Sequence, residues 1–441
     1  MKILLCQSYF GEKIYEPVVF PLGLSYIASM VKDKHEVYCF DPNVTENPMK
    51  VLFDLINKIN PDVIGVSLRN IDSTFSFYKR SYYAPFISLI RNIRAVSPYC
   101  KLIVGGAGFS IFAKEIMRRN PEIDLGVVSE GELTFAELIK DIDHPERVKN
   151  VIVRKGNNLF FTGKRAWTDF DSLPFPSREL FDLKKYKHRS YSIGVQTKRG
   201  CSFNCMFCPN WFISGTSCLC RSPKKVVDEI EFSTNELGLN SFFFTDSIFN
   251  FPAHHSRAIC KELIKRKLDI EWSAEFNPEF INSSFMEEAH KSGCNLFNFS
   301  PDGASNNALK SLGKSFTMKD IENSIALAKQ IKSANFGYSF LYDLPYYNHE
   351  HVVGLTKLVP KIMATINTRL SYISFTKIRI FPYTLIYKIA LKEKKIDKNT
   401  DLLYPVHYEN SFSDFLPNLI QTFAYAFHTV TKACRFIGKK T

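Results

Sequence analysis

The sequence has no apolar run long enough to cross a lipid bilayer, which takes ~20 residues. Its amino-terminal stretch MKILLCQSYF is short, and Glu12 and Glu16 follow where a signal peptide would be cleaved, so it predicts a buried strand. Blocks of basic residues are also missing. Although the formal net charge is +13, Lys and Arg are scattered and no nucleic-acid-binding motif is present. These absences favour a soluble protein that binds no nucleic acid.

The positive charge by itself is compatible with an anionic membrane surface or an acidic substrate. A solvated, Lys-rich surface explains it equally simply. The sequence also lacks a cysteine pattern typical of disulfide bonds: 11 cysteines, an odd number, are spread over 441 residues. Such a distribution argues against a disulfide framework and indicates reduced thiols in a cytoplasmic setting.

One stretch departs from this even spread. In RGCSFNCMFC, Cys201, Cys205 and Cys208 fall within eight residues and have no fourth cysteine beside them. A close triplet of thiols points to metal or redox chemistry.

The first 150 residues alternate apolar runs with helical patterns, and the runs KILLCQSY, HEVYCFDP, DVIGVSLR, KLIVGGA and DLGVVSEG predict five strands. Continuous Val/Ile/Leu runs between helices are typical of strands buried on both faces of a parallel sheet. The pattern predicts a doubly wound, Rossmann-like α/β domain over residues 1–150. Its ligand is expected beyond the carboxyl ends of the strands. The loops at that edge are Cys6–Pro21, Ser67–Asp72, Gly105–Gly108 and Ser129–Glu132.

Glycines mark one of these loops. Gly105 and Gly106 follow a strand and precede a helix, which suits close backbone approach to a phosphate or amide group of a cofactor. No full GxGxxG motif is present, so a tight turn explains the glycines equally well.

Residues 151–190 change in character. VIVRKGNNLFF predicts a small hairpin, and Pro174 and Pro176 indicate a linker between domains. From Tyr191 a second series of six strand patterns alternates with helical patterns. This series predicts a partial (β/α)6 barrel over residues 191–385, with its chemistry at the carboxyl ends of the strands. Cys201 follows the first of them.

Residues 386–441 predict a short helical carboxyl-terminal segment rich in Phe, Tyr and Ala. A helix that caps the barrel is the simpler interpretation. A surface helix beside lipid or an apolar substrate is the alternative.

The cysteine triplet is best explained by an iron–sulfur cluster, whose usual ligands are thiolates. Three ligands on a four-iron cubane leave one iron open to bind another molecule, as in catalytic zinc sites. A structural zinc site is the alternative. His254 and His255 lack zinc-ribbon spacing, but Cys218 and Cys220 offer further thiols.

The pattern Cys-x3-Cys-x2-Cys, with Phe207 before the third cysteine and Arg199-Gly200 before the first, resembles the signature of the radical S-adenosylmethionine (radical SAM) superfamily. Further stretches resemble its cobalamin-binding-domain subfamily: PLGLSYIASMV, VGGAGFS, SEGELTFAELI, LPFPSRELFD, RSPKKVVDEIEF and FPYTLIYKIA. The resemblance covers roughly residues 1–390. It implies a [4Fe–4S] cluster, S-adenosylmethionine (SAM) and cobalamin as cofactors.

Residue by residue, the resemblance makes Cys201, Cys205 and Cys208 the cluster ligands and Phe207 the aromatic residue beside the adenine of SAM. The open iron would be chelated by SAM. Electron transfer would then cleave SAM and produce a 5′-deoxyadenosyl radical.

Other positions match the family less closely. Thr245 and Asp246 fall where, in the family, the second strand contacts the SAM amino group. Glu275 ends the third strand, and its side chain is expected to contact SAM, the substrate or solvent. Asp302 and Ser305 lie in SPDGAS, where the family often has Gly-Ile-Glu-Ser-Gly-Ser, so Asp302 replaces a glutamate that contacts SAM.

Four more residues have open roles. Asp343 stands where a glycine is usual, and Arg379, assigned to the final strand, is expected to bind a carboxylate or to reach solvent. Cys218 and Cys220 offer a second metal site or redox thiols. Two reduced loop thiols are the simpler interpretation.

One family motif is missing. The cobalamin-binding histidine motif Asp-x-His-x-x-Gly is replaced after the first strand by CQSYFGE. Many members of the subfamily also lack it, so cobalamin remains the expected cofactor. The alternative is an amino-terminal domain kept only as a scaffold.

Together these features predict a cobalamin-dependent radical SAM methyltransferase acting on an unactivated carbon, with one SAM supplying the radical and a second methylating cobalamin. The alternative is a non-methylating rearrangement, cyclisation or coupling on the same architecture. A non-catalytic sensor would need an output module, and the sequence has none. The expected partners are a reductant such as flavodoxin or ferredoxin and a small-molecule substrate. The Phe-rich composition suits a lipid or aromatic one, and membrane-surface contact is compatible with the carboxyl-terminal pattern.

Overall fold

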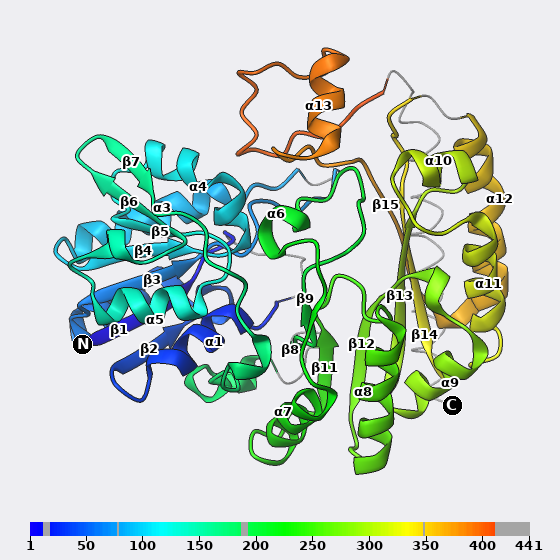
Figure 1. Cartoon of the computed structure of the whole chain (residues 1–441), viewed down its shortest axis with the longest axis horizontal. Helices are drawn as coiled ribbons and strands as arrows, with labels where there is room; N and C mark the ends of the chain where they lie inside the picture. Colours follow the sequence, from blue (N-terminus) through cyan, green and yellow to red (C-terminus); the bar gives the residue numbers. More distant parts are fainter. Residues whose placement is uncertain (12–17, 77–78, 187–192, 347–348, 411–441) are drawn as a thin grey trace.

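The computed structural model describes residues 1–11, 18–76, 79–186, 193–346 and 349–410. Two units, each built on a largely parallel sheet, lie side by side, the amino-terminal one at the left of Figure 1 and the other at the right. The predicted α/β class, with a doubly wound domain ahead of a partial barrel, is confirmed.

The amino-terminal unit contains a seven-stranded sheet in the order β2-β1-β3-β4-β5-β6-β7. Its parallel strands are β1 (Lys2–Gln7), β2 (Glu36–Phe40), β3 (Val63–Ser67), β4 (Lys101–Gly105) and β5 (Leu125–Val127). Its helices are α1 (Leu22–Val31), α2 (Pro48–Ile59), α3 (Tyr83–Val96), α4 (Ala107–Arg119) and α5 (Glu132–Lys140). Because β1 leads to β2 on one side and β3 follows on the other, the strand order reverses at β1/β3, where open α/β sheets bind ligands.

The predicted hairpin extends this sheet and is not part of a free linker. β6 (Val151–Lys155) pairs antiparallel with β5, and β7 (Asn158–Phe161) pairs antiparallel with β6. Val151, Ile152 and Val153 are buried, so apolar burial attaches the hairpin to the sheet edge. The connection between the two units therefore begins after Phe161.

The second unit contains six parallel strands in the order β15-β14-β13-β12-β11-β8. They are β8 (Gly194–Val195), β11 (Ser241–Phe244), β12 (Glu271–Phe276), β13 (Cys294–Asp302), β14 (Asn335–Leu341) and β15 (Leu370–Thr376). The helices are α6 (Asn210–Ser214), α7 (Pro223–Asn235), α8 (Ala253–Arg266), α9 (Ser283–Lys291), α10 (Asn306–Ser311), α11 (Met318–Ala328), α12 (His349–Ile366) and α13 (Leu385–Lys392). A short ribbon of β9 (Lys198–Arg199) and β10 (Leu219–Cys220) flanks the cysteine loop.

Short 3-10 turns complete the described chain: η1 (Pro42–Val44), η2 (Pro145–Arg147), η3 (Phe170–Ser172), η4 (Arg178–Leu180), η5 (Leu183–Lys185), η6 (Pro278–Phe280) and η7 (Asn367–Arg369). Most of the residues with the predicted carboxyl-terminal helical pattern, 411–441, lie outside the described residues. Within the described residues, no helix combines the length and apolar character needed to cross a bilayer.

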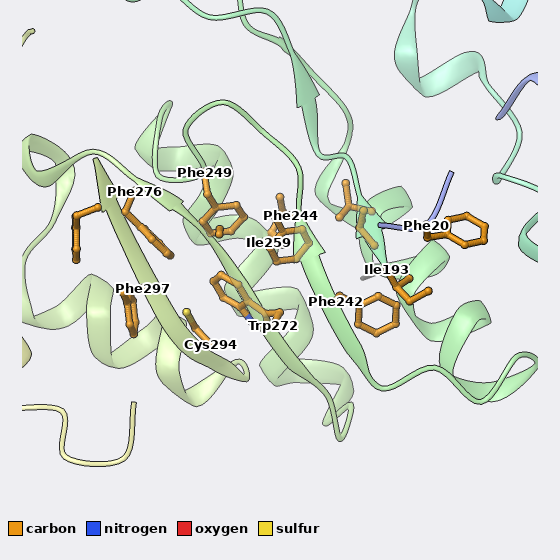
Figure 2. Close-up of a cluster of buried hydrophobic side chains, with 14 of the residues drawn as sticks. Phe20, Ile193, Phe242, Phe244, Phe249, Ile259, Trp272, Phe276, Cys294 and Phe297 are labelled. Atoms are coloured by element: carbon orange, nitrogen blue, oxygen red, sulfur yellow. The ribbon is translucent and has the colours of Figure 1, made fainter. Parts of the chain in front are cut away.

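Aromatic side chains form the layer between the barrel strands and their helices. Figure 2 shows Phe244, Phe249, Trp272 and Phe276 packed together, and the rings of Phe244 and Phe249 stack with centroids 4.9 Å apart. All four side chains are at most 1% exposed. Since successive strand residues point to opposite faces, the residues between these aromatics face the barrel interior.

Candidate functional site

The cysteine loop lies at the carboxyl end of β8, where a parallel barrel places its chemistry. The loop is fixed by backbone hydrogen bonds: Cys201 N donates to Gly215 O (3.2 Å) and Cys208 N donates to Cys205 O (3.1 Å). Gly200 has φ +80°, and a Cβ at this position would lie 2.1 Å from Ser217 O. Only glycine therefore fits in front of the first cysteine.

The three thiols lie close enough to influence one another electrostatically. Burial raises the pKa of each thiol, and that of Cys208 reaches about 11. The described residues include no three His, Cys, Asp or Glu side chains that converge on a single metal ion. A structural zinc site needs its ligands around one ion, whereas a cubane needs spaced thiolates because each binds a different iron. Partly buried, spaced thiols fit a cluster, which deprotonates the thiols that bind it.

A lysine that the sequence did not single out lies beside the cysteines. Lys314 Nζ forms an ion pair with Asp302 and lies 5.4 Å from the ring centroid of Phe207. Burial lowers the pKa of Lys314, but Asp302 and the thiols of Cys205 and Cys208 outweigh it, so the pKa is raised overall. The cluster loop thus has a buried positive charge that would offset thiolate charge. The only sequence signal was a Gly-Lys pair after a helix.

Asp246 positions the backbone ahead of the cysteines. Its carboxylate accepts hydrogen bonds from Thr197 N (2.9 Å) and Lys198 N (3.1 Å) and pairs with Lys198 Nζ (3.1 Å). Thr245 Oγ1 donates to Val195 O (3.4 Å). These contacts tie β11 to the segment that leads into the cluster loop. A contact with SAM stays a prediction for both residues.

Glu275, Ser300 and Ser305 lie at the carboxyl ends of the next strands. Ser300 Oγ donates to Glu275 Oε2 (3.2 Å), and burial raises the pKa of Glu275 to about 7. Burial also raises the pKa of Asp302, which Lys314 only partly counters. Ser305 Oγ accepts from Ala308 N (3.1 Å) and caps α10. The barrel mouth therefore holds two desolvated carboxyl groups.

A cavity of about 260 Å³ lies at the carboxyl edge of the amino-terminal sheet. Gly105 and Gly106 form part of its wall. Gly106 has φ +101°, and a Cβ there would lie 2.6 Å from Leu68 O, so a side chain cannot be accommodated. The deeper wall is apolar and consists of Leu5, Leu24, Ile27, Ile103, Val127 and Phe135.

The same cavity is lined from the second unit by Gln196, Arg199, Ile213 and Ser214, which flank the cysteines. Ser129 Oγ, from the loop after β5, donates to Ile213 O (2.7 Å). One wall therefore belongs to the amino-terminal sheet and the opposite wall to the cluster loop.

Arg199 joins these walls through two ion pairs. Its guanidinium lies 2.9 Å from Glu130 Oε1 and 2.5 Å from Glu132 Oε1, and all three side chains are at most 8% exposed. Burial lowers the pKa of Arg199, but the carboxylates of Glu132 and Glu130 outweigh it and raise the pKa overall. Arg199, which directly precedes Gly200 and Cys201, is thus held by side chains of the amino-terminal unit.

A second buried network joins the units away from the cavity. Glu229 on α7 accepts from Arg178 (2.6 Å), pairs with Arg221, and accepts from Tyr26 OH of α1 (3.3 Å). The side chains of Arg178, Arg221 and Glu229 are at most 1% exposed. Burial raises the pKa of Glu229, but the two arginines outweigh it and hold the pKa below its usual value.

The position predicted for Arg379 was wrong. β15 ends at Thr376, and Arg379 lies beyond it in an isolated bridge with His407. Its Nε lies 2.6 Å from Asp72 Oδ2 of the amino-terminal unit, so its carboxylate partner belongs to the chain itself. Asp343 is buried and lies 3.9 Å from Lys377 Nζ.

Cys218 and Cys220 border the cluster loop. Ser202 Oγ lies 3.6 Å from Cys218 Sγ, while Cys220 is exposed at the end of the β9–β10 ribbon. Neither forms a disulfide in the structure, and their role stays a prediction.

Comparison with known proteins identifies two family matches along the chain. Residues 15–139 match the model of the B12 binding domain, and residues 180–359 match the model of the radical SAM superfamily. The first match covers most of the amino-terminal unit. The second covers the cysteine loop and most of the barrel.

Individual relatives are distant. An uncharacterized methyltransferase of Pyrococcus horikoshii is 26% identical over 376 residues, which cover 84% of this chain and 78% of that protein. An anaerobic magnesium-protoporphyrin IX monomethyl ester cyclase of Cereibacter sphaeroides is 24% identical over 249 residues, 53% of this chain and 40% of the cyclase. The solved structure of the radical S-adenosylmethionine methyltransferase TsrM from Kitasatospora setae, with tryptophan and a SAM analogue bound, has a TM-score of 0.77 at 20% identity, covering 89% of this chain and 76% of that one. That structure therefore shares the fold.

Proposed function

The chain belongs to the radical SAM superfamily and carries the B12-binding domain of its cobalamin-binding subfamily, and from this premise we propose that it methylates an unactivated carbon of a small molecule. Its cofactors are a [4Fe–4S] cluster, SAM and cobalamin. When bound, they supply a radical that removes a hydrogen atom and a methyl group that replaces it.

One observation supports this proposal most directly: the glycine-lined cavity and the cysteine loop share a wall. Gly105 and Gly106 line the cavity on one side, and Gln196, Arg199 and Ile213 line it on the other. A substrate between the two sites would face both. The ion pairs of Arg199 with Glu130 and Glu132 hold the two walls together.

The lining of the cavity suits part of cobalamin. Its apolar side chains suit the flat base of the cofactor's nucleotide tail, and Gly106 lets the glycine loop pack closely against the backbone of Leu68, which a side chain would prevent. The residues given as lining this cavity include no histidine. This favours binding without a histidine ligand to cobalt.

For the cluster, we assign Cys201, Cys205 and Cys208 as ligands. Lys314, placed between Asp302 and Phe207, is suited to hold the carboxylate of SAM and to offset thiolate charge. Thr245 is suited to contact the SAM amino group. Asp246 acts by positioning the loop because its carboxylate already has protein partners.

The barrel interior favours a polar substrate over the lipid or aromatic one suggested by composition. Glu275 lies in register with Asn298, Asn298 with Gly337, and Gly337 with Tyr372. Tyr372 OH donates to Asn298 Oδ1 (2.9 Å). The many Phe side chains pack instead under the helices, as Figure 2 shows. The aromatic composition therefore serves the core, and we propose a hydrogen-bonding small molecule as substrate.

The experiment combines cofactor content with methyl transfer. Anaerobically reconstituted protein should contain about four irons and one cobalt per chain. With methyl-labelled SAM and a reductant, label should appear in products together with 5′-deoxyadenosine. If the reconstituted protein bound no cobalt and still released 5′-deoxyadenosine, the methyltransferase proposal would be contradicted.

That outcome would favour the alternative, a non-methylating reaction. The relative named as a cyclase supports keeping this alternative, because it is similar to half of this chain. We further propose a cytoplasmic location and a flavodoxin- or ferredoxin-type reductant, since free thiols and an iron–sulfur cluster need a reducing environment.

A further inference from the structure

Helix α13 lies directly on the cluster loop. Ile386 N donates to Met206 O (3.0 Å), and Met206 packs among Ile386, Ile389 and Ala390. Phe207 contacts the same apolar cluster. In Figure 1, α13 lies at the top, above α6. A helix is about 10–12 Å thick, so the outer face of α13 is among the described surfaces close to the cysteines.

The outer face of α13 is basic. Leu385, Lys388 and Lys392 lie on α13 at helical spacing and are exposed, and Lys395, three residues beyond the end of the helix, is exposed as well. Lys394 and Lys398 are exposed beside them. Two acidic residues lie among them: Glu393 accepts from Tyr408 OH (2.5 Å), and Asp397 accepts from Asn399 N (2.7 Å). With five lysines against two carboxylates, residues 385–398, here called the basic stripe, keep a net positive charge.

Exposed apolar side chains border this stripe. Trp211 is 45% exposed, Tyr383 54% and Leu385 53%. Phe212 stacks on Tyr383 with ring centroids 4.7 Å apart and connects α6 with the start of α13. An apolar centre beside a charged rim is typical of a protein-binding surface.

We propose that this surface, defined as Trp211, Tyr383, Leu385, Lys388, Lys392 and Lys395, docks an acidic electron-transfer protein that reduces the cluster. The inference rests on the proposed function, because a radical SAM cluster must receive an electron. One electron passes from the reduced flavin or iron–sulfur centre of the donor, which is oxidised by one electron, to the cluster, which is reduced by one.

Charge and distance both support this occupant. The basic stripe attracts an acidic partner and steers its approach. The apolar patch supplies the short-range contact. Electron transfer slows steeply with distance, and docking on α13 leaves little more than one helix between the donor and the loop that contains Met206 and Phe207.

The test compares two charge-reversal variants of the full chain, both reconstituted with cluster. K388E/K392E/K395E alters the proposed surface, and K319E/K329E/K357E makes the same charge change at exposed lysines of α11, its carboxyl end and α12. The rate of cluster reduction is followed by absorbance, with reduced recombinant flavodoxin as donor and with dithionite as a small donor that needs no docking. Flavodoxin affinity is measured by calorimetry.

We expect K388E/K392E/K395E to lower the second-order rate with flavodoxin at least ~10-fold at low salt and to weaken binding. The rate with dithionite should not change, and K319E/K329E/K357E should match wild type. Rising ionic strength should remove most of the difference. Should the reversal variant misfold, K388Q/K392Q/K395Q is the substitute, with a smaller decrease expected.

Equal flavodoxin rates in all three proteins would overturn the docking surface. So would unchanged flavodoxin rates together with lost binding to vesicles containing phosphatidylserine, which would assign the stripe to a membrane surface. Wild type that cannot cleave SAM even with dithionite would instead refute the proposed function, so the two failures are distinguishable.

Discussion

The carboxyl edges of the two sheets differ in how they are built to hold ligands. The amino-terminal edge consists of glycine and apolar walls around a cavity of about 260 Å³, with Gly106 in a conformation that excludes side chains. The barrel edge carries thiols, a buried lysine and two desolvated carboxyl groups. The amino-terminal edge is suited to hold a ligand by complementary shape, and the barrel edge is suited to hold one by coordination bonds and charge.

This difference has a physical consequence. A large cofactor held by shape depends on how the cavity wall packs, so one added methyl group in that wall is enough to weaken its binding. A cluster held by coordination depends on specific atoms, and neighbouring side chains tune it without deciding whether it binds. Changes at the two edges should therefore have separable effects.

The largest expected effect is at the cysteine loop. C201A/C205A/C208A should reduce iron from about four per chain to near zero and abolish SAM cleavage, because no thiolate remains to bind the cluster. Cobalamin binding should persist, measured by its visible spectrum after gel filtration. The matched variant C218A/C220A should keep its iron; if it loses the iron, the ligand assignment is wrong.

The next effect concerns Arg199, which joins the two edges. R199A leaves Glu130 and Glu132 buried without their partner, and this should lower the free energy of unfolding by about 3–5 kcal/mol in urea titrations. R199M/E130Q/E132Q removes the charges of all three side chains and should recover much of the free energy of unfolding that R199A loses. Equal instability of the two variants would show that packing, not unpaired charge, is responsible.

At the glycine edge, G106A should weaken cobalamin binding more than ~10-fold while iron content stays unchanged. The added Cβ would meet Leu68 O at 2.6 Å in a positive-φ position. G156A is the control, because Gly156 also has positive φ (+58°) but an added Cβ would meet nothing within 4 Å. Similar losses in both variants would point to backbone strain and not to the cavity.

The smallest effect is a pH dependence at Glu275. Its folded pKa of about 7 exceeds the ordinary 4.5, so the folded chain holds this proton more tightly. The resulting stability is fully present below pH 4.5 and is lost as the pH rises through about 7. Relative to wild type, E275Q should therefore gain roughly 1–3 kcal/mol between pH 4.5 and pH 8 in urea titrations of the cofactor-free protein.

E271Q, at the exposed start of the same strand, serves as the control. It should show no such gain. A flat difference between E275Q and wild type across this range would mean that the carboxyl group is well hydrated.

Much of the fold could be predicted from local pattern. Continuous apolar runs identified β1 to β5, because a strand buried on both faces needs apolar residues at nearly every position. The six strand patterns after Tyr191 identified β8 and β11 to β15. The hairpin β6–β7 was recognised as a hairpin, but its attachment to the sheet was not. Pairing with β5 depends on a distant strand edge, which local periodicity does not encode.

The site divides in the same way. Cys201, Cys205 and Cys208 were found because cluster ligands share one short loop, and local spacing records them. Lys314 was missed because it reaches the loop from more than 100 residues away, through an ion pair with Asp302. The Phe-rich composition suggested an apolar substrate, but the strand register directs those rings under the helices.

By itself, the sequence determined the βα series, the cysteine triplet and the family, since each of these is written in neighbouring residues. Only the tertiary structure decided that Arg199 is paired across the units with Glu130 and Glu132, that Arg379 is bound to Asp72, and that the glycine cavity borders the cluster loop. The physical reason is that ion pairs and cavity walls join residues far apart in the chain. Their partners are fixed by packing and not by spacing.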